Sequence, residues 1–311
     1  MSLESCLPAA LQNPATTITP IAAGLSGAGV YRVEAGDRTC VLKVGDQGAP
    51  LDDWRRTLHI QQLAAAAGLA PDIIHADESR RAVVSAFVVD RSFPALYGNP
   101  ATRDAAIALL GTTIRRLHQI AVPADAKPRD GRQYLADTWS MVGTSASHPA
   151  FVSEVVRRIL AEPPIARAQL VLCHNDVNPS NLVYDGERLV LLDWETAGAN
   201  DRFFDTASIS VFLRLDDTAC LQLLSAYEDA PVATIPVQFA QNRRLAAALC
   251  GSILLRLAHY AGYAGPTSET LESTPSMSDF YQRMRAGTVS IASGEGQWCF
   301  GLALIKASAE S

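Results

Sequence analysis

The chain has 311 residues, of which 48% are hydrophobic and 19% charged, enough apolar material for one large domain or two lobes that share a cleft. This composition argues against extensive disorder, and a formal charge of −6 argues against a nucleic-acid-binding surface. The sequence shows no signal peptide, no apolar run that could span a bilayer and no C-x-x-C pair among its six cysteines. We therefore expect a cytoplasmic protein without a zinc site or disulfide framework, and with neither nucleic acid nor a membrane as partner.

Strands and a glycine-rich turn are predicted near the N-terminus. Alternating side chains and turn residues indicate three strands, at residues 18–22, 30–33 and 39–44. The turn between the first two contains Ser26, Gly27 and Gly29, and glycines there allow backbone amides to approach a phosphate group closely. Lys43 lies in the third strand. Taken alone, this segment predicts no more than a hairpin.

The middle and the end of the chain are predicted to be mainly helical. Apolar residues at helical spacing predict four helices, at residues 51–67, 101–120, 150–160 and 243–263. Residues 82–89 form an apolar strand that breaks at Asp90, where a hinge backbone can contact adenine. Prolines, glycines and polar residues predict a loop-rich insertion at 122–147 and an exposed loop at 266–278, and the pattern from Ala207 onward is helical.

The most informative segment is 171–207, VLCHNDVNPSNLVYDGERLVLLDWETAGANDRFFDTA. His174, Asp176 and Asn181 stand in the order H-x-D-x-x-x-x-N. Two short apolar runs follow, joined by an Asp-Gly pair that is typical of a β-hairpin turn, and the second run ends at Asp193. Such a hairpin would return Asp193 to the neighbourhood of Asn181.

These residue types in this order indicate phosphoryl transfer from ATP. One carboxylate, Asp176, accepts the proton of a substrate hydroxyl, while an amide and a second carboxylate, Asn181 and Asp193, hold Mg²⁺ against the triphosphate. Upstream of this loop, Lys43 has the right position to reach the α- and β-phosphates, and the glycine-rich turn becomes a nucleotide clamp. The sequence therefore predicts ATP and Mg²⁺ as cofactors.

The predicted helix at 51–67 departs from this pattern. A helix at this position in kinases supplies a glutamate that pairs with the strand lysine. No glutamate occurs between Arg55 and Ala67. Either Lys43 has another partner, or an amide or histidine of this helix holds it, the nearest candidates being His59, Gln61 and Gln62.

Taken together, these motifs resemble the aminoglycoside phosphotransferase and choline kinase superfamily, and H-N-D with the later D-W-E-x-A-G-x-N is most similar to bacterial choline and ethanolamine kinases. The resemblance implies an α+β, protein-kinase-like fold with a small β-rich N-lobe at 1–89 and a larger, mainly helical C-lobe at 90–311. It implies the roles given above for Asp176, Asn181, Asp193 and Lys43. It also implies supporting roles for four further residues: Glu195 and Asn200 on the acceptor side, His174 as a brace of the loop, and Asp205 as a structural partner of the loop.

The acceptor and the oligomeric state stay open at this stage. We expect a small, hydroxylated and cationic acceptor, because Asp176 and Glu195 leave negative potential beside the reacting hydroxyl, although Glu195 can instead pair with Arg202. A choline-like acceptor calls for aromatic faces. The candidates for these are Tyr227, Tyr260, Tyr263, Phe280, Tyr281 and Trp298, each of which can equally be a core residue. The alternatives are an aminoglycoside or other antibiotic phosphotransferase, a thiamine kinase, and a non-catalytic pseudokinase.

Overall fold

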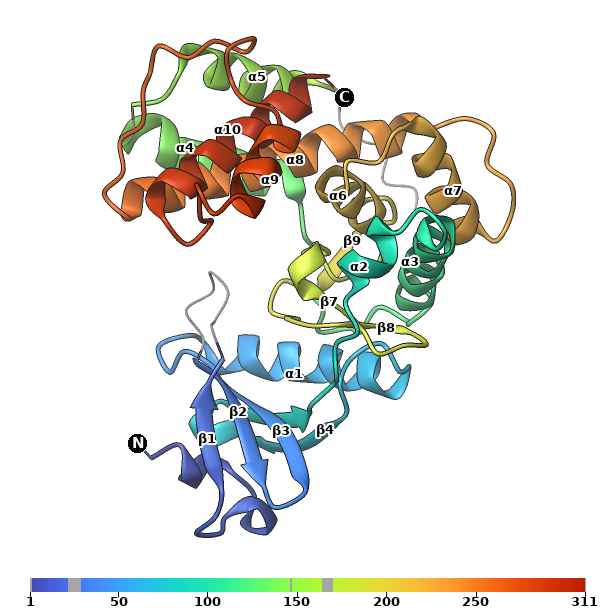
Figure 1. Cartoon of the computed structure of the whole chain (residues 1–311), viewed down its shortest axis with the longest axis vertical. Helices are drawn as coiled ribbons and strands as arrows, with labels where there is room; N and C mark the ends of the chain where they lie inside the picture. The colour runs from blue at the N-terminus through green and yellow to red at the C-terminus, as the bar shows by residue number, and fades with distance from the viewer. Residues whose placement is uncertain (1, 22–28, 146, 164–169, 311) are drawn as a thin grey trace. The chain divides into compact units, whose positions relative to one another are not determined.

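The computed structural model describes residues 2–21, 29–145, 147–163 and 170–310 (Figure 1). The chain contains both an antiparallel sheet and many helices, which confirms the predicted α+β class. It divides into two compact units, each described by itself below. The first unit comprises Met1–Lys127, Val171–Ala199 and Gln222–Pro231, and the second comprises Pro128–Leu170, Asn200–Leu221 and Val232–Ser311. The lobe boundary between residues 89 and 90 stays a prediction.

The first unit is built on a five-stranded antiparallel sheet with the strand order β1-β2-β3-β5-β4. The strands are β1 (Thr17–Pro20), β2 (Gly29–Ala35), β3 (Arg38–Val44), β4 (Ile73–Asp77) and β5 (Ala82–Ala86). In β3, Cys40 and Leu42 are buried in an apolar cluster on one face of the sheet. Because side chains alternate along a strand, Lys43 points to the other face. It lies opposite Val30 of β2 and Val83 of β5.

Helix α1 (Leu51–Ala66) confirms the helix predicted at 51–67. The backbone leaves the helix direction at Gly68, whose φ of +70° favours glycine. Two arginines satisfy carbonyl groups just beyond the helix end: Arg116 donates to Ala67 and Arg188 donates to Gly68. These cations also oppose the negative end of the helix dipole.

The remaining helices are α2 (Phe93–Gly98), α3 (Arg103–His118), α4 (Gly131–Ser145), α5 (Ala150–Ala161), α6 (Phe204–Phe212), α7 (Asp217–Glu228), α8 (Val237–Tyr260), α9 (Met277–Arg285) and α10 (Gly294–Glu310). The helices predicted at 101–120, 150–160 and 243–263 are confirmed, with α8 beginning six residues earlier than expected. The strand expected at 82–89 ends already at Ala86. Strand β4 and helix α2 were not predicted.

The loop-rich insertion predicted at 122–147 is wrong, because α4 occupies most of it. Asp130 starts this helix by accepting hydrogen bonds from the backbone amides of Arg132 and Gln133. Leu135, Thr138 and Val142 follow at helical spacing and are buried. Polar Gln133, Asp137 and Ser140 lie on the exposed side of the helix.

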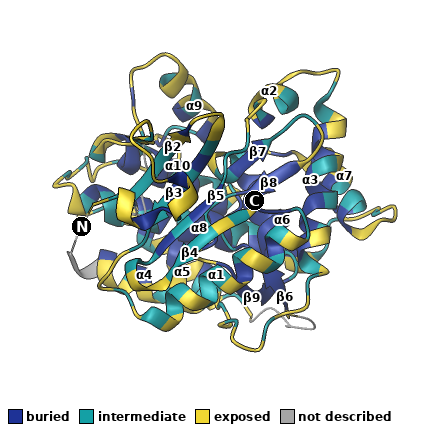
Figure 2. Cartoon of the chain, turned by 90° about the horizontal axis from the view of Figure 1, so that it is seen from below, coloured by how far each residue is buried: buried dark blue, intermediate teal, exposed yellow. Residues whose placement is uncertain are grey.

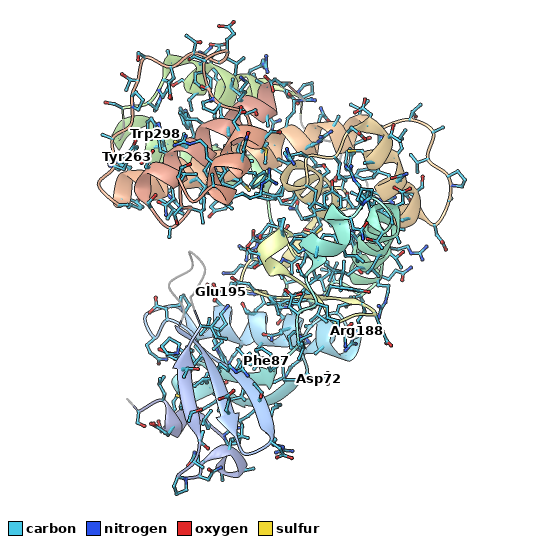
Figure 3. All side chains as sticks on the ribbon, viewed as in Figure 1. Asp72, Phe87, Arg188, Glu195, Tyr263 and Trp298 are labelled. Atoms are coloured by element: carbon cyan, nitrogen blue, oxygen red, sulfur yellow. The ribbon has the colours of Figure 1, made fainter. Side chains whose placement is uncertain are left out.

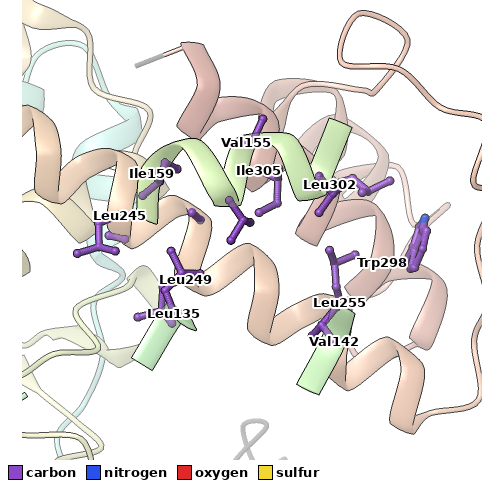
Figure 4. Close-up of a cluster of buried hydrophobic side chains, with 14 of the residues drawn as sticks. Leu135, Val142, Val155, Ile159, Leu245, Leu249, Leu255, Trp298, Leu302 and Ile305 are labelled. Carbon is purple, nitrogen blue, oxygen red and sulfur yellow. The ribbon is translucent and has the colours of Figure 1, made fainter. Parts of the chain in front are cut away.

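The core of the second unit is an apolar cluster contributed by α4, α5, α8 and α10 (Figure 4). It includes Leu135, Val155, Leu249, Leu302 and Ile305. Half of the residues of α8 are buried, which fits its position against these neighbours, and Figure 2 shows the chain coloured by burial. Among the described residues, no helix combines the length and apolarity that crossing a membrane would require.

Helices α8 and α10 approach closely at two glycines, Gly251 and Gly301. A Cβ atom at Gly251 would lie 2.8 Å from the carbonyl oxygen of Gly301 and 2.9 Å from Cγ1 of Ile305. We therefore expect Gly251→Ala to lower the free energy of unfolding by about 1–3 kcal/mol, because a backbone carbonyl cannot move away without its helix. Guanidinium denaturation followed by circular dichroism measures the change.

Gly98→Ala in α2 serves as the control, because a Cβ atom there would have no neighbour within 4 Å. This substitution should leave stability unchanged or raise it by up to about 1 kcal/mol. Equal midpoints for the two variants would contradict the close approach of α8 and α10.

Candidate active site

A β-hairpin positions the polar segment 174–181. Strand β6 (Leu170–Cys173) leads into this segment, the short helix η4 (Pro179–Asn181) ends it, and β7 (Leu182–Tyr184) pairs antiparallel with β8 (Leu189–Leu191). The turn at Gly186 has a φ of +113° and so favours glycine. Beyond β8, the amide of Leu192 donates to the carbonyl of Asn181 over 2.9 Å. The predicted hairpin is confirmed, and it returns the chain beside Asn181.

Two asparagines orient the carboxylate of Asp176. Asn178 Nδ2 donates to Oδ1 over 2.9 Å and Asn181 Nδ2 donates to Oδ2 over 2.8 Å. Burial raises the pKa of Asp176 above its usual value, and the charge of Asp193 adds to this effect, while the charge of His174 and the two amide hydrogen bonds oppose it. A carboxylate with a raised pKa is a better proton acceptor, so these contacts suit Asp176 to act as a base.

Both ring nitrogens of His174 are engaged. Nε2 lies 2.9 Å from the carbonyl oxygen of Leu192, and Nδ1 lies 3.3 Å from the backbone amide of Asp176, which donates to it. The side chain is fully buried and packs edge-on against Trp194. His174 thus ties the loop to the end of β8.

Lys43 meets two carboxylates. Its Nζ lies 2.8 Å from Oδ1 of Asp193 and 2.8 Å from Oε1 of Glu195, the residue labelled on the segment beyond β8 in Figure 3. Burial lowers the pKa of Lys43, but the charge of Asp193 and the hydrogen bonds to both carboxylates outweigh it, so the pKa lies above its usual value. Asp193 has a φ of +63°, in the left-handed region that few residues other than glycine adopt.

The two ion pairs of Lys43 take the place of the contact that helix α1 makes in other kinases. His59 pairs with Asp125 at 3.2 Å, and the partners of Lys43 within the described ranges are Asp193 and Glu195. The carboxylate that the helix lacks is therefore supplied by the segment after β8. Neither the sequence pattern nor the spacing indicated this, because Lys43 and Asp193 are 150 positions apart.

Two residues that the sequence analysis did not assign to the site help to hold it. Asn175 has a φ of +65°, and its Nδ2 donates to the carbonyls of Thr196 and Gly198 over 3.1 and 3.3 Å. Thr196 Oγ1 in turn donates to the carbonyl of His174 over 3.0 Å. These contacts join the loop to the D-W-E segment. The signal for Asn175 was its place in H-N-D, since asparagine tolerates a left-handed conformation.

The other predicted site residues lie in different places. Gly29 is the first residue of β2, opposite Val44, while Ser26 and Gly27 are outside the described residues. Asn200 and Asp205 belong to the second unit and are buried. The oxygen of the Asn200 side chain accepts from the amide of Asp201, and Asp205 lies in the first turn of α6.

The comparison with known families and proteins gives a consistent result. The family described as "Phosphotransferase enzyme family" matches residues 17–268, which is more than half of the chain. Protein LicA of Haemophilus influenzae is 42% identical over 55 residues, 18% of this chain and 21% of that protein. The match thus spans only about a fifth of the length of such curated relatives.

Solved structures share the fold over most of the chain. A choline/ethanolamine kinase family protein from Mesorhizobium loti is 19% identical, with a TM-score of 0.62, and covers 93% of this chain and 92% of its own. LicA in complex with AMP is 15% identical, with a TM-score of 0.61 and coverages of 90% and 95%. An aminoglycoside-3'-phosphotransferase of type VIII is 20% identical, with a TM-score of 0.58 and coverages of 76% and 94%. The predicted superfamily and fold are confirmed.

We expect Asp176→Asn to lower the turnover of ATP by about 10²–10⁴-fold while the affinity for nucleotide is retained. The amide cannot take a proton from a hydroxyl, yet it keeps the size of the side chain. It also presents a donor to Asn178 or Asn181, so one of these side chains must turn. Steady-state kinetics and nucleotide titration measure the two effects, with Asp104→Asn, an exposed aspartate of α3, as control.

The pH dependence provides a second measurement on the same variant. A base must be deprotonated to work, so the rate of the parent enzyme should fall as the pH drops through the raised pKa of Asp176, above the range of an ordinary aspartate. The residual rate of Asp176→Asn should not fall over this pH range, the acid limb of the pH–rate profile. Activity of the variant within a few-fold of the parent, with an unchanged acid limb, would contradict the role of Asp176.

Proposed function

The chain belongs to the phosphotransferase enzyme family, and from this premise we propose that it transfers the γ-phosphate of ATP to the hydroxyl group of a cationic amino alcohol of the choline or ethanolamine class. The family confirms the predicted enzyme class, an ATP-dependent phosphotransferase with an alcohol acceptor. The observation that carries the finer proposal is the ion pairing of Lys43 with Asp193 and Glu195 beside the half-buried Asp176.

In this proposal Asp176 takes the proton of the acceptor. The acceptor oxygen bonds to the γ-phosphorus, the bond from that phosphorus to the ADP oxygen breaks, and the hydroxyl proton passes to the Asp176 carboxylate. Hydrogen bonds from Asn178 and Asn181 fix the direction of this carboxylate before the acceptor arrives. Preorganisation of this kind lowers the barrier, because no group has to turn during the reaction.

The residues present fit a magnesium ion. Asn181 uses its Nδ2 for Asp176, and its Oδ1 has no hydrogen-bond partner among the residues that the structure describes. Asp193 offers carboxylate oxygens from the neighbouring strand end, and hard oxygen ligands are those that Mg²⁺ prefers. Asn181 and Asp193 would hold the ion, which when bound neutralises charge on the triphosphate. Binding of a nucleotide agrees with the similarity to LicA in complex with AMP.

Glu195 takes the part that a helix glutamate takes in other kinases, that of holding the strand lysine towards the phosphates. Lys43 is shared between Asp193 and Glu195 in this structure. With Asp193 engaged as a metal ligand, Glu195 would keep the ammonium in place. Glu195 as a residue of the acceptor pocket, and its pairing with Arg202, stay predictions.

A cationic acceptor is favoured by charge more than by aromatic residues. The chain is acidic overall, and Asp176 and Asp193 supply carboxylates at the site, whereas the charge of Glu195 is used in holding Lys43. Several aromatic candidates are occupied as core residues: Tyr227 bonds to His118, Phe280 stacks on Phe300, and Trp298 packs against Tyr263 (Figure 3). A carboxylate-lined site suits a protonated amine at least as well as a quaternary ammonium.

The location and the alternatives follow from the same proposal. None of the six cysteines is in a disulfide, which suits the reducing, ATP-containing cytoplasm.

The similarity to an aminoglycoside-3'-phosphotransferase keeps an antibiotic kinase as the second candidate, with a thiamine kinase behind it. A pseudokinase is disfavoured, because Lys43, Asp176, Asn181 and Asp193 are all present with the side-chain contacts described above.

We predict that Glu195→Gln raises the KM for ATP by about three- to tenfold and leaves the KM for the acceptor unchanged. The amide removes one of the two charges that hold Lys43, and the partial exposure of both side chains limits the effect. Glu187→Gln, at an exposed glutamate in the hairpin turn, should change neither constant. A rise in the acceptor KM alone would instead assign Glu195 to the acceptor pocket.

A panel of acceptors tests the proposed substrate class directly. ADP release is measured with choline, ethanolamine, thiamine and a set of aminoglycosides, with Asp176→Asn as the blank for uncoupled hydrolysis. We expect kcat/KM for an amino alcohol to exceed that for thiamine and for each aminoglycoside by at least about tenfold, or about 1.4 kcal/mol. A preference for an aminoglycoside would move the proposal to the antibiotic kinases, and no turnover with any acceptor would favour the pseudokinase.

A further inference from the structure

A pocket of about 240 Å³ opens within the second unit, away from the residues discussed so far. It is lined by the loop after α6, by Arg243 of α8, by the start of α9 and by the last turns of α10, and Figure 1 shows α9 and α10 side by side. We call it the Arg243 pocket. Its volume suits a small ligand and not a nucleotide.

Three basic side chains line the Arg243 pocket: Arg214, Arg243 and Lys306. None of them forms an ion pair with a carboxylate in the part of the chain that the structure describes. Cations gathered at one place repel each other unless anions neutralise them. Among the described residues these three cations form no ion pair, although Lys306 also feels the charge of Asp279 in α9.

The hydrogen bonds of these cations go to neutral groups. Arg243 donates through Nη2 to the carbonyl of Leu215 over 2.6 Å, and Lys306 donates to the carbonyl of Thr274 over 2.8 Å. Arg214, which is exposed, donates to the hydroxyl of Ser278. Arg243 Nε is buried and donates to no described residue, which is an unfavourable state for a charged donor.

Two acidic residues, Asp216 and Glu310, also line the pocket. Asp216 is exposed, and its Oδ1 accepts from the amide of Ala219 in α7, so this carboxylate is used in starting that helix. Glu310 lies at the exposed end of α10. Basic groups outnumber acidic ones among the lining residues, and Ser278 adds a hydroxyl group beside them. The hydroxyl of Ser276 donates to Asp279 at the start of α9.

We propose that the Arg243 pocket binds a phosphate group, either as inorganic phosphate or on a small phosphomonoester. Two guanidinium groups and one ammonium match a doubly charged anion, and guanidinium is suited to the spacing of phosphate oxygens. The hydroxyl of Ser278, which accepts from Arg214, can donate to a remaining oxygen. The proposal does not rest on the proposed kinase function, because the residues concerned take no part in it.

Isothermal titration calorimetry of the full chain, in EDTA and without nucleotide, tests the proposal with inorganic phosphate as the probe. We expect one saturable site per chain. Arg243→Gln and Arg214→Gln should each weaken phosphate binding by at least about tenfold, the effect of losing a charge-assisted hydrogen bond. Arg285→Gln, at an exposed arginine of the neighbouring α9, should leave the affinity unchanged.

A second arm uses glycerol 3-phosphate and separates the two sources of the anion. Tighter binding than inorganic phosphate assigns the pocket to a phosphomonoester, and weaker binding assigns it to free phosphate. Because Arg214 is exposed, Arg214→Gln should fold even if Arg243→Gln does not, and circular dichroism verifies both. The proposal would be overturned if phosphate showed no saturable binding, or if Arg285→Gln weakened phosphate binding as much as the pocket variants do. It would also be overturned if excess ADP abolished the phosphate signal, because the phosphate would then bind at the nucleotide site.

Discussion

A single ammonium group joins the β-sheet of the first unit to the segment that carries the D-W-E motif. Lys43 is placed by its strand: its neighbour Leu42 is buried in the sheet core, so Lys43 points to the opposite face. Asp193 and Glu195 meet it there at equal distances of 2.8 Å. Removing the ammonium would leave two carboxylates close together with only water to separate them, so the arrangement depends on this one charge.

Around this ion pair, the loop is held mainly by amide side chains. Asn178 and Asn181 donate to the carboxylate of Asp176, and Asn175 donates to carbonyls of the segment beyond Asp193. Asparagine is neutral, so it can direct a carboxylate without forming an ion pair that would strongly depress its pKa. Burial can then raise the pKa of Asp176, which an arginine in the same place would prevent.

The sequence predicted those parts of the molecule in which local chemistry decides the outcome. The hairpin around Gly186 and the helix that ends before Gly68 both depend on residues close together in the chain. The order of Lys43, Asp176 and Asp193 can be read directly from the sequence. Helix α4 was missed because its few buried residues, such as Leu135, gain their stability from packing against other helices. The Lys43 anchor was missed for the same reason, since it joins residues that are distant in sequence.

The origin of that anchor has a consequence for how the site is assembled. Where a separate helix supplies the glutamate, movement of the helix can withdraw the lysine from the phosphates while the metal ligand stays in place. Here Asp193 and Glu195 are two positions apart on one segment, and that segment is tied to the loop through Asn175 and Thr196. The lysine anchor and the proposed metal ligand can therefore move only together. Movement of α1 would withdraw no carboxylate from Lys43. Regulation would therefore have to act on the D-W-E segment itself or elsewhere on the chain.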